Sequence, residues 1–433
     1  NLMNILVLAN YVAPEQGIAS IRWTKLIKYL KRNHPVDQIH VLTRHGSDLS
    51  GRQDSTLVKD TEWFDQMYSV KDSEWVRFCK KVWMQFKKYW KPESGSFVDN
   101  TLKVPVRRQG ERDYFRRLKK KTSQLDLKQY NVVISSYGPL WPVELGHHLK
   151  QNHPSLFWIV DFRDQWVRDF DSDTEKSWKK DWALSVTRGA DMFFRVNDHL
   201  DLVETWDKPV VTIPNGFDPE DRQTAVGADT FIISYTGTVY KTDDLDPFFQ
   251  ALKELTAGGD MALEDISIVY AGRTPELFAA SVRKFGLKDR YTDLGWIDRA
   301  QSLQLQARSS LLLMAGWCTE TDVVEWSGKM YEYMMAEKPV VYLMAGTVPG
   351  SLPAQDIQKV GGICYESCRH EDTYASMSDY ILMQYCLWKQ DGEVHVCQDK
   401  EYVNQYSYET IASQVYDILC EGLHQSAEQE GIQ

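Results

Sequence analysis

The segment SGKMYEYMMAEKPVV, residues 327–341, holds the residues of this chain best suited to chemistry. Gly328 precedes a helical pattern, so Lys329 falls in a first helical turn, where free N–H groups and the helix dipole already favour an anion. Such a helix start can hold a diphosphate. Glu332 lies three residues further on the same face, where a carboxylate can accept two hydrogen bonds from ribose hydroxyls. A plain surface ion pair between Lys329 and Glu332 is the alternative.

Other loops in the same half of the chain carry a glycine after an apolar run. The runs 231–237, 266–272 and 309–316 each end in glycine, and Leu294-Gly295-Trp296-Ile297 adds a fourth loop. Ligands of parallel α/β sheets bind beyond the carboxyl ends of the strands, so these loops predict contacts to a nucleotide. The residues concerned are Gly237, Thr238, Arg273, Trp296 and Ile297. Trp296 and the backbone of Ile297 are candidates to contact the base, with a plain core position as the alternative for Trp296.

The elements that must position these residues form two series. Buried strands of a parallel sheet need no polar alternation, and such runs occur at NILVLA (4–9), IHVLT (39–43), VVISS (132–136) and FWIVDF (157–162). The second series is FIISYTG (231–237), ISIVYAG (266–272), SSLLLMAG (309–316) and KPVVYLMA (338–345). Because helical segments separate the runs, each series predicts an α/β domain of its own.

The length of the chain agrees with two domains, since 433 residues exceed the roughly 250–300 at which a single core stops growing. Turn residues around Pro214 and Pro219 separate the two series. The expected domains are 1–221 and 222–405. The tail 406–433 has apolar residues on one helical face, which predicts a packed helix that can cross back to the first domain. These residues are Ile411, Val415, Ile418 and Leu419.

Composition excludes several classes of protein. The formal net charge of −11 argues against a general nucleic-acid-binding protein. No signal-like region and no window of about 18 apolar residues occurs, so a cytoplasmic protein is expected. The seven scattered cysteines suit reduced thiols. Cys364 and Cys368 lack a partner pair at zinc spacing, and no metal site is expected.

The stretch 75–121 is basic within an acidic chain. It holds 15 Lys and Arg residues, interleaved with Trp83, Phe86, Tyr89, Trp90, Tyr114 and Phe115. This composition predicts an amphipathic surface for anionic lipid headgroups, inserted in the first domain. A solvated helical hairpin is the alternative.

Four further segments extend the pattern around Lys329 along nearly the whole chain. They are the loop Asn10–Gly17 with Arg22 after it, VDFRDQW (160–166), IPNGFD (213–218) and YTGT (235–238). Together the five motifs resemble those of the retaining glycosyltransferases of family 4, the glycogen-synthase-like group 1 enzymes. The resemblance implies a GT-B fold, in which two Rossmann-like α/β domains face one another across a cleft. The first would bind the acceptor and the second the nucleotide sugar.

The resemblance also implies roles for individual residues. Lys329, with the backbone of Gly17 and Gly328, would stabilise the departing diphosphate, so neither a metal nor a cofactor is expected. Three residues of the first domain would bind the donor sugar or orient the acceptor hydroxyl, namely Asp161, Arg163 and Asp164. A buried salt-bridge cluster at a strand end is the alternative for these three.

Two departures from the family pattern concern the donor site. Many members have two glutamates with seven residues between them, whereas Val324 occupies the first position here. Glu325, Glu320 and Asp322 are the candidates to replace it. Many members also have Arg and then Lys after the first glycine of the nucleotide domain, where this chain has Thr238, Tyr240 and Lys241.

The reaction expected from the resemblance is transfer of a sugar from UDP or GDP to a glycan or a polyprenyl-diphosphate-linked acceptor in bacterial surface polysaccharide assembly. Such an enzyme can lie peripherally on the inner face of the cell membrane. A nucleotide-sugar 2-epimerase of the same architecture and a non-catalytic nucleotide-sugar-binding module are the alternatives. The residue pattern leaves the sugar, the linkage and the oligomeric state open.

Overall fold

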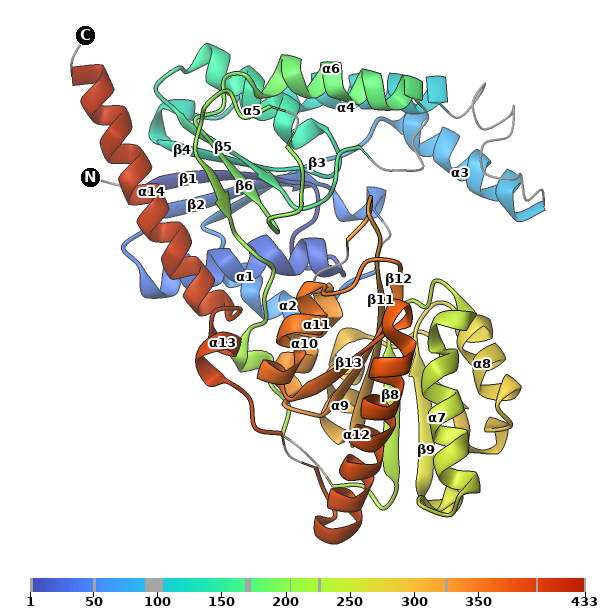
Figure 1. Cartoon of the computed structure of the whole chain (residues 1–433). Helices are drawn as coiled ribbons and strands as arrows, with labels where there is room; N and C mark the ends of the chain where they lie inside the picture. Colours follow the sequence, from blue (N-terminus) through green and yellow to red (C-terminus); the bar gives the residue numbers. More distant parts are fainter. Residues whose placement is uncertain are drawn as a thin grey trace. The chain divides into compact units, whose positions relative to one another are not determined.

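The computed structural model divides the chain into two compact units. Unit 1 comprises Asn1–Pro214 and Ala412–Gln433, and unit 2 comprises Asn215–Ile411 (Figure 1). The described residues are 3–49, 52–89, 104–167, 173–202, 204–224, 227–323, 326–394 and 396–431.

Unit 1 contains a seven-stranded sheet with the order β3-β2-β1-β4-β5-β6-β7. Its neighbouring strands are parallel throughout, with Ile5 of β1 between Ile39 of β2 and Val132 of β4. The strands are β1 (Asn4–Ala9), β2 (Gln38–Arg44), β3 (Gln66–Val70), β4 (Val132–Ser136), β5 (Phe157–Phe162), β6 (Met192–Arg195) and β7 (Val210–Thr212). A parallel order of this kind requires a crossover between strands, and helices supply most of the crossovers.

Helices cover both faces of this sheet. The larger helices of unit 1 are α1 (Ile18–Asn33), α3 (Glu74–Tyr89), α4 (Val104–Thr122), α5 (Trp141–Asn152), α6 (Asp173–Thr187) and α14 (Tyr408–Gly431), and α2 (Ser55–Val58) is short. Of these, α3 extends away from the sheet (Figure 1). Leu6 and Leu8 share a core with α4, α5 and α6. Tyr114 of α4 belongs to that core at 1% exposure, which corrects its assignment to a lipid-facing surface.

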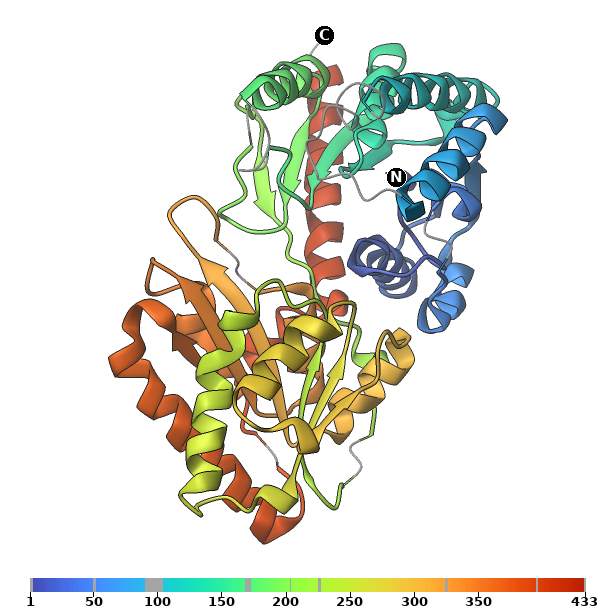
Figure 2. The same cartoon turned by 90° about the vertical axis from the view of Figure 1, so that its right-hand side faces the viewer.

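The C-terminal helix α14 runs alongside unit 1 in both views (Figures 1 and 2). The ring of Tyr416 stacks on His34 of α1, with 4.6 Å between centroids. Ile411, Val415 and Leu419 are each at most 1% exposed, as their helical spacing predicts.

Unit 2 contains a six-stranded parallel sheet with the order β10-β9-β8-β11-β12-β13. Its strands are β8 (Phe231–Thr236), β9 (Ile266–Ala271), β10 (Tyr291–Asp293), β11 (Leu311–Cys318), β12 (Val340–Gly346) and β13 (Gly362–Glu366). Its helices are α7 (Asp246–Ala257), α8 (Pro275–Lys284), α9 (Arg299–Arg308), α10 (Gly328–Ala336), α11 (Leu352–Asp356), α12 (His370–Asp391) and α13 (Lys400–Asn404).

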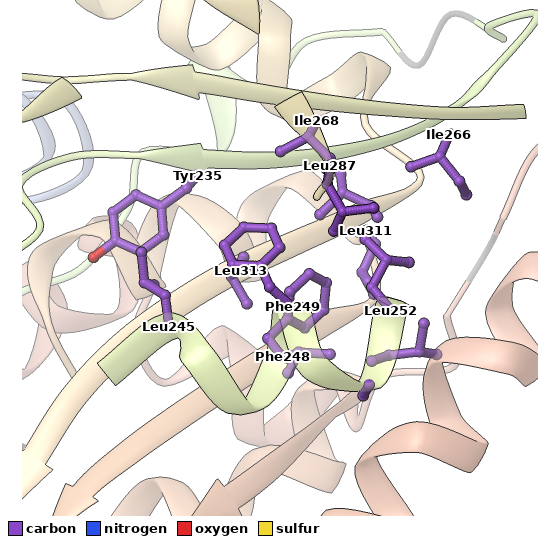
Figure 3. Close-up of a cluster of buried hydrophobic side chains, with 14 of the residues drawn as sticks. Tyr235, Leu245, Phe248, Phe249, Leu252, Ile266, Ile268, Leu287, Leu311 and Leu313 are labelled. Carbon is purple, nitrogen blue, oxygen red and sulfur yellow. The ribbon is translucent and has the colours of Figure 1, made fainter. Parts of the chain in front are cut away.

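The two faces of this sheet bury different cores because side chains alternate along each strand. Leu311 and Leu313 join one core with α7, α8 and α12 (Figure 3). Leu312 and Met314 join the other, with α9 and α10. Burial on both faces explains why the strands read as continuous apolar runs.

Short 3-10 helices complete the units. They are η1 (Gly46–Asp48), η2 (Lys59–Trp63), η4 (Leu127–Gln129), η5 (Pro219–Asp221), η6 (Thr242–Leu245), η7 (Leu263–Asp265), η8 (Lys288–Arg290), η9 (Ile357–Val360) and η10 (Ser367–Arg369). Among the helices of the described residues, none combines the length and apolar character that crossing a bilayer demands.

Candidate active site

The glycine loops of unit 2 come together at the carboxyl ends of β8, β9 and β10. The N–H of Gly237 donates to the carbonyl of Ala271 at 2.8 Å, and the N–H of Gly272 donates to that of Gly295 at 2.9 Å. Gly237 has a φ of +135°, a conformation that side chains oppose. The backbone of three consecutive strand ends therefore meets at one edge of the sheet, as the spacing of the runs predicts.

Helix α10 begins beside the loop that follows β8. A Cβ atom added to Gly237 would lie 3.7 Å from Cγ of Lys329, so the lysine side chain runs along this loop. Ser327 precedes the helix, and its side chain makes no capping hydrogen bond. The first N–H groups of a helix have no partner within the helix, so this N-terminus can receive an anion.

Glu332 is one turn further along α10 and is held by three side chains. Its Oε2 accepts hydrogen bonds from Nζ of Lys329 at 2.9 Å and from Nε2 of Gln306 at 3.0 Å. Its Oε1 accepts one from Nε of Arg299 at 3.2 Å. A carboxylate has about four acceptor positions, and these three contacts occupy most of them. The ribose contact expected of Glu332 stays a prediction.

The electrostatics of this cluster favour the charged form of Glu332. Burial by itself would raise the pKa of this carboxyl, but the charges of Lys329 and Arg299 outweigh it and lower the pKa to about 2. The side chain of Glu332 is 9% exposed, whereas that of Lys329 is 28% exposed. The pair is therefore no ordinary surface ion pair, and its cation is the accessible partner.

A second layer of side chains fixes the cluster. Nη1 of Arg299 donates to Asp221 at 2.9 Å, and Nε2 of Gln306 also donates to Oγ1 of Thr236 at 3.3 Å. The hydroxyl of Tyr333 lies 3.2 Å from the N–H of Thr236, and burial raises the pKa of this tyrosine to about 12. The structure thus ties α9 and α10 to the end of β8.

Arg299 and Gln306 belong to none of the sequence motifs described above. A signal was present, because Arg299, Ser302 and Gln306 occupy positions i, i+3 and i+7 of α9 and are all at most 6% exposed. A polar stripe on the inner face of a helix needs partners in the protein or in a ligand.

The other residues expected to bind the donor occupy more open positions. Arg273 is exposed after β9. Trp296 is 39% exposed, which excludes the plain core position. Ile297 is half-buried next to Asp298, the N-cap of α9. The backbone carbonyl of Thr238 accepts a hydrogen bond of 3.1 Å from the hydroxyl of Tyr235.

The three candidates to replace the first glutamate of the family differ in environment. Glu320 is exposed, whereas Asp322 is half-buried and accepts a hydrogen bond from Nε1 of Trp317 at 2.8 Å. Glu325 lies outside the described residues. The carboxylate of Glu320 is therefore more accessible to solvent than that of Asp322.

In unit 1, Asp161 is sealed inside the protein. Arg22 donates to both carboxylate oxygens, at 2.8 and 3.1 Å, and Nε1 of Trp23 donates at 2.7 Å. The side chains of Asp161 and Arg22 are both 0% exposed. This is the buried salt-bridge cluster given above as the alternative, and the contact between Asp161 and a sugar stays a prediction. Asp161 fixes the position of Arg22 at the end of β5.

Arg163 and Asp164, which follow β5, are more accessible. Nη2 of Arg163 donates to the carbonyl of Gly138 at 2.6 Å, and Nη1 donates to Asp164 at 3.0 Å. The Asp164 side chain is 46% exposed. At the same edge of the sheet, Gly17 is the N-cap of α1 with a φ of +128°, and an added Cβ would meet no atom within 4 Å. Its backbone is therefore approachable.

Metal-binding groups do not form a cluster in the part of the chain that the structure describes. No set of three or more His, Cys, Asp or Glu residues with a geometry that could hold an ion occurs there.

Comparison with known proteins identifies the fold. No family profile matches the chain, and no curated protein matches it by sequence. Sucrose-phosphate synthase from Thermosynechococcus elongatus is similar in structure, with a TM-score of 0.58, 13% identity and coverage of 97% of this chain and 98% of that one. A glycosyltransferase from Rickettsia africae has a TM-score of 0.56 and 14% identity, over 98% and 99% of the chains. A proposed UDP-N-acetylglucosamine 2-epimerase from Listeria monocytogenes has a TM-score of 0.54 and 10% identity, over 98% of both chains.

These similarities extend over both units, and the sequence identities are too low to carry an activity. With its two parallel-sheet, Rossmann-like α/β units, the chain has a fold of the GT-B type.

Proposed function

We propose that this chain is a retaining glycosyltransferase that uses a UDP- or GDP-linked sugar. The acceptor would be a glycan or a polyprenyl-diphosphate-linked sugar of bacterial surface polysaccharide assembly. The observation that carries the proposal is the grouping of Lys329, Glu332 and Gly237 where α10 begins. An accessible cation, the N-terminus of a helix and close backbone approach are together suited to a diphosphate.

The proposed reaction breaks the bond between the anomeric carbon and a phosphate oxygen, and the electron pair stays on that oxygen. A bond forms between the same carbon and the acceptor oxygen, on the same face of the ring, and the acceptor proton moves to the departing phosphate. Negative charge therefore grows on the diphosphate in the transition state. Lys329 and the first N–H groups of α10 would stabilise it there. Arg163 and Asp164 would orient the donor sugar or the acceptor hydroxyl.

Metal independence is part of the proposal. In this arrangement Lys329 supplies the positive charge that a divalent ion supplies in other nucleotide sites. Arg299 lies one layer behind, where it holds Glu332 and maintains the position of the lysine.

We also propose that the chain associates with an anionic membrane surface. Trp75, Phe78 and Val82 lie at i, i+3 and i+7 of α3 and are 52%, 64% and 51% exposed. Basic side chains interleave with them, which suits an anionic headgroup layer. The side chains of Trp83, Phe86, Tyr89 and Trp90 lie outside those described. Phe78→Glu should reduce binding to vesicles with phosphatidylglycerol and leave nucleotide binding intact.

A nucleotide-sugar 2-epimerase is the second candidate, favoured by the similarity to the Listeria protein. It would convert its nucleotide sugar into an epimer without any acceptor, whereas a transferase releases the nucleoside diphosphate. Analysis of the products formed with and without acceptor separates the two.

The test of the proposed site is a calorimetric titration of the full chain with UDP, GDP, ADP, TDP and CDP, with and without magnesium. One nucleotide should bind without magnesium. Lys329→Ala should weaken its binding about 10- to 100-fold, since hydrogen bonds to charged groups contribute about 1.5–3 kcal/mol. Lys253→Ala is the matched control, because Lys253 is an exposed lysine on α7 of the same unit.

Each other outcome contradicts a part of the proposal. Binding that requires magnesium would remove metal independence. Equal affinity of Lys329→Ala and Lys253→Ala would remove Lys329 from the site. Failure of all five nucleotides would favour a different ligand, and binding without turnover of any nucleotide sugar would favour the non-catalytic module.

A further inference from the structure

Unit 1 has a cavity that the residues discussed so far do not explain. It measures about 420 Å³ and lies between α4, α5 and α6, which pack together over one face of the sheet (Figure 1). Its lining includes Arg44, the last residue of β2, and Pro139, which follows β4. The volume lies within the range of small-molecule sites, roughly 300–1,000 Å³.

Aromatic side chains form much of the cavity wall. Tyr114 and Trp141 meet edge to face with 5.8 Å between ring centroids, and Phe115 meets His148 in the same way at 6.3 Å. Trp178 of α6 also lines the cavity and is 39% exposed. Flat, rigid rings of this kind offer an apolar face together with a polar edge.

Polar groups that suit hydroxyls lie among these rings. Oε1 of Glu144 accepts a hydrogen bond from Nε1 of Trp182 at 3.0 Å. Burial raises the pKa of Glu144 and lowers the pKa of His147. Nδ1 of His147 is buried and has no hydrogen-bond partner in the described part of the chain. Because Nδ1 is sealed from the cavity, a hydroxyl can contact His147 only at the rest of its imidazole, which lines the cavity.

The charges of the lining argue against an anion. Two arginines, Arg44 and Arg112, are balanced by two glutamates, Glu111 and Glu144. The guanidinium carbon of Arg44 already lies 4.0 Å from the ring centroid of Tyr114. Its Nε lies 3.7 Å from Oδ1 of Asp72. Against a hydrocarbon chain, the polar side chains of the lining, Glu144 and His147 among them, would gain no hydrogen-bond partner.

We propose that this cavity binds a neutral sugar ring, with its C–H face on the ring of Trp178, an accessible aromatic side chain of the lining, and its hydroxyls on Glu144 and His147. The cavity also adjoins the strand ends of unit 1. Nε1 of Trp141 donates to Asn10 at 2.7 Å, and Pro139 follows Gly138, whose carbonyl holds Arg163. A sugar bound there would be part of the acceptor. That role rests on the proposed function, whereas sugar binding itself does not.

The experiment is saturation-transfer NMR of the full chain with a panel of methyl glycosides of the common hexoses, N-acetylhexosamines and 6-deoxyhexoses, without nucleotide. At least one should give a saturable signal. Trp178→Ala and the shape-conserving Glu144→Gln should each weaken it at least fivefold. Trp75→Ala is the matched control, an exposed tryptophan of unit 1 that does not line the cavity. Nucleotide affinity should be the same in all four proteins.

Three results would overturn the proposal. They are the absence of a saturable signal from every glycoside, equal affinity of wild type and both cavity variants, and displacement of the bound glycoside by an alkyl chain that carries no sugar. The nucleotide titration reports independently on unit 2, so sugar binding without nucleotide binding would refute the proposed function and leave the sugar site standing.

Discussion

Asp161 in unit 1 and Glu332 in unit 2 are both buried carboxylates that pair with an arginine, and they differ in what else reaches them. The partners of Asp161, Arg22 and Trp23, are themselves 0% exposed. Glu332 is bonded to Lys329, whose side chain is 28% exposed. Sequence motifs alone suggested a ligand role for both carboxylates. The exposure of the partner, more than the presence of a buried ion pair, therefore marks the place where a ligand can bind.

The largest expected effect on folding comes from breaking the sealed pair. Asp161→Asn leaves the Arg22 charge buried without its carboxylate, which should lower the free energy of unfolding by about 3–5 kcal/mol. Urea denaturation measures it. Asp113→Asn, which removes a half-exposed partner of Arg117 on α4, should cost less than about 0.5 kcal/mol. A small loss for Asp161→Asn would mean that the carboxylate is not sealed.

Low pH should reduce the contribution of the Glu332 cluster to the free energy of unfolding. Because the pKa of Glu332 in the folded state, about 2, lies below its ordinary 4.5, its contribution to stability is complete above pH 4.5 and is lost as the pH falls toward 2. The shift corresponds to about 3 kcal/mol. The free energy of unfolding of Glu332→Gln should therefore depend less steeply on pH in this interval. If the free energies of unfolding of wild type and variant had the same dependence on pH, the lowered pKa would be contradicted.

Alanine substitutions at one glycine of each unit should have a smaller effect on stability. Gly17 and Gly237 both have a φ that opposes side chains, so alanine at either should cost about 1–2 kcal/mol. Only the Cβ at position 237 would lie beside Lys329. Gly237→Ala should therefore also weaken nucleotide binding severalfold.

Gly286→Ala is the control for this effect, because Gly286 has a φ of +74° in unit 2 with open space around it. Its nucleotide affinity should equal that of wild type by calorimetry. If Gly237→Ala also bound nucleotide like wild type, the loop after β8 would not contact the ligand.

Much of the fold follows from apolar runs. The run NILVLA coincides with β1, VVISS with β4 and FWIVDF with β5, and both sheets are parallel as expected. The strands that no run predicted are short or lie toward sheet edges. For example, β10 has three residues and β3 is largely exposed, so neither needs a continuous apolar sequence.

The candidate site was predictable where neighbours in sequence are neighbours in space. Lys329 and Glu332 share a helix face, so their contact follows from spacing. The bonds from Arg299 and Gln306 join residues 33 and 26 positions from Glu332, and no local pattern encodes them. The seal around Asp161 likewise depends on Arg22, 139 residues away. Burial created by tertiary packing decides which charged residues remain accessible.

The smallest effect on folding is expected at Arg163, whose side chain is 14% exposed, whereas that of Arg22 is sealed. Arg163→Lys keeps the charge but loses the forked donor geometry that serves Gly138 and Asp164. Its free energy of unfolding should fall by less than about 1 kcal/mol. If Arg163 orients the reacting sugar, turnover should fall about 100-fold. Nucleotide affinity should not change, because the Lys329 cluster is intact.

Arg195→Lys is the control for this variant, since Arg195 also pairs with an aspartate of unit 1, Asp198, and is more exposed than Arg163. It should retain turnover. Unchanged turnover in Arg163→Lys would remove Arg163 from the reaction. A stability loss as large as that of Asp161→Asn would place Arg163 with the sealed cluster, and the distinction between sealed and accessible charges at the end of β5 would then fail.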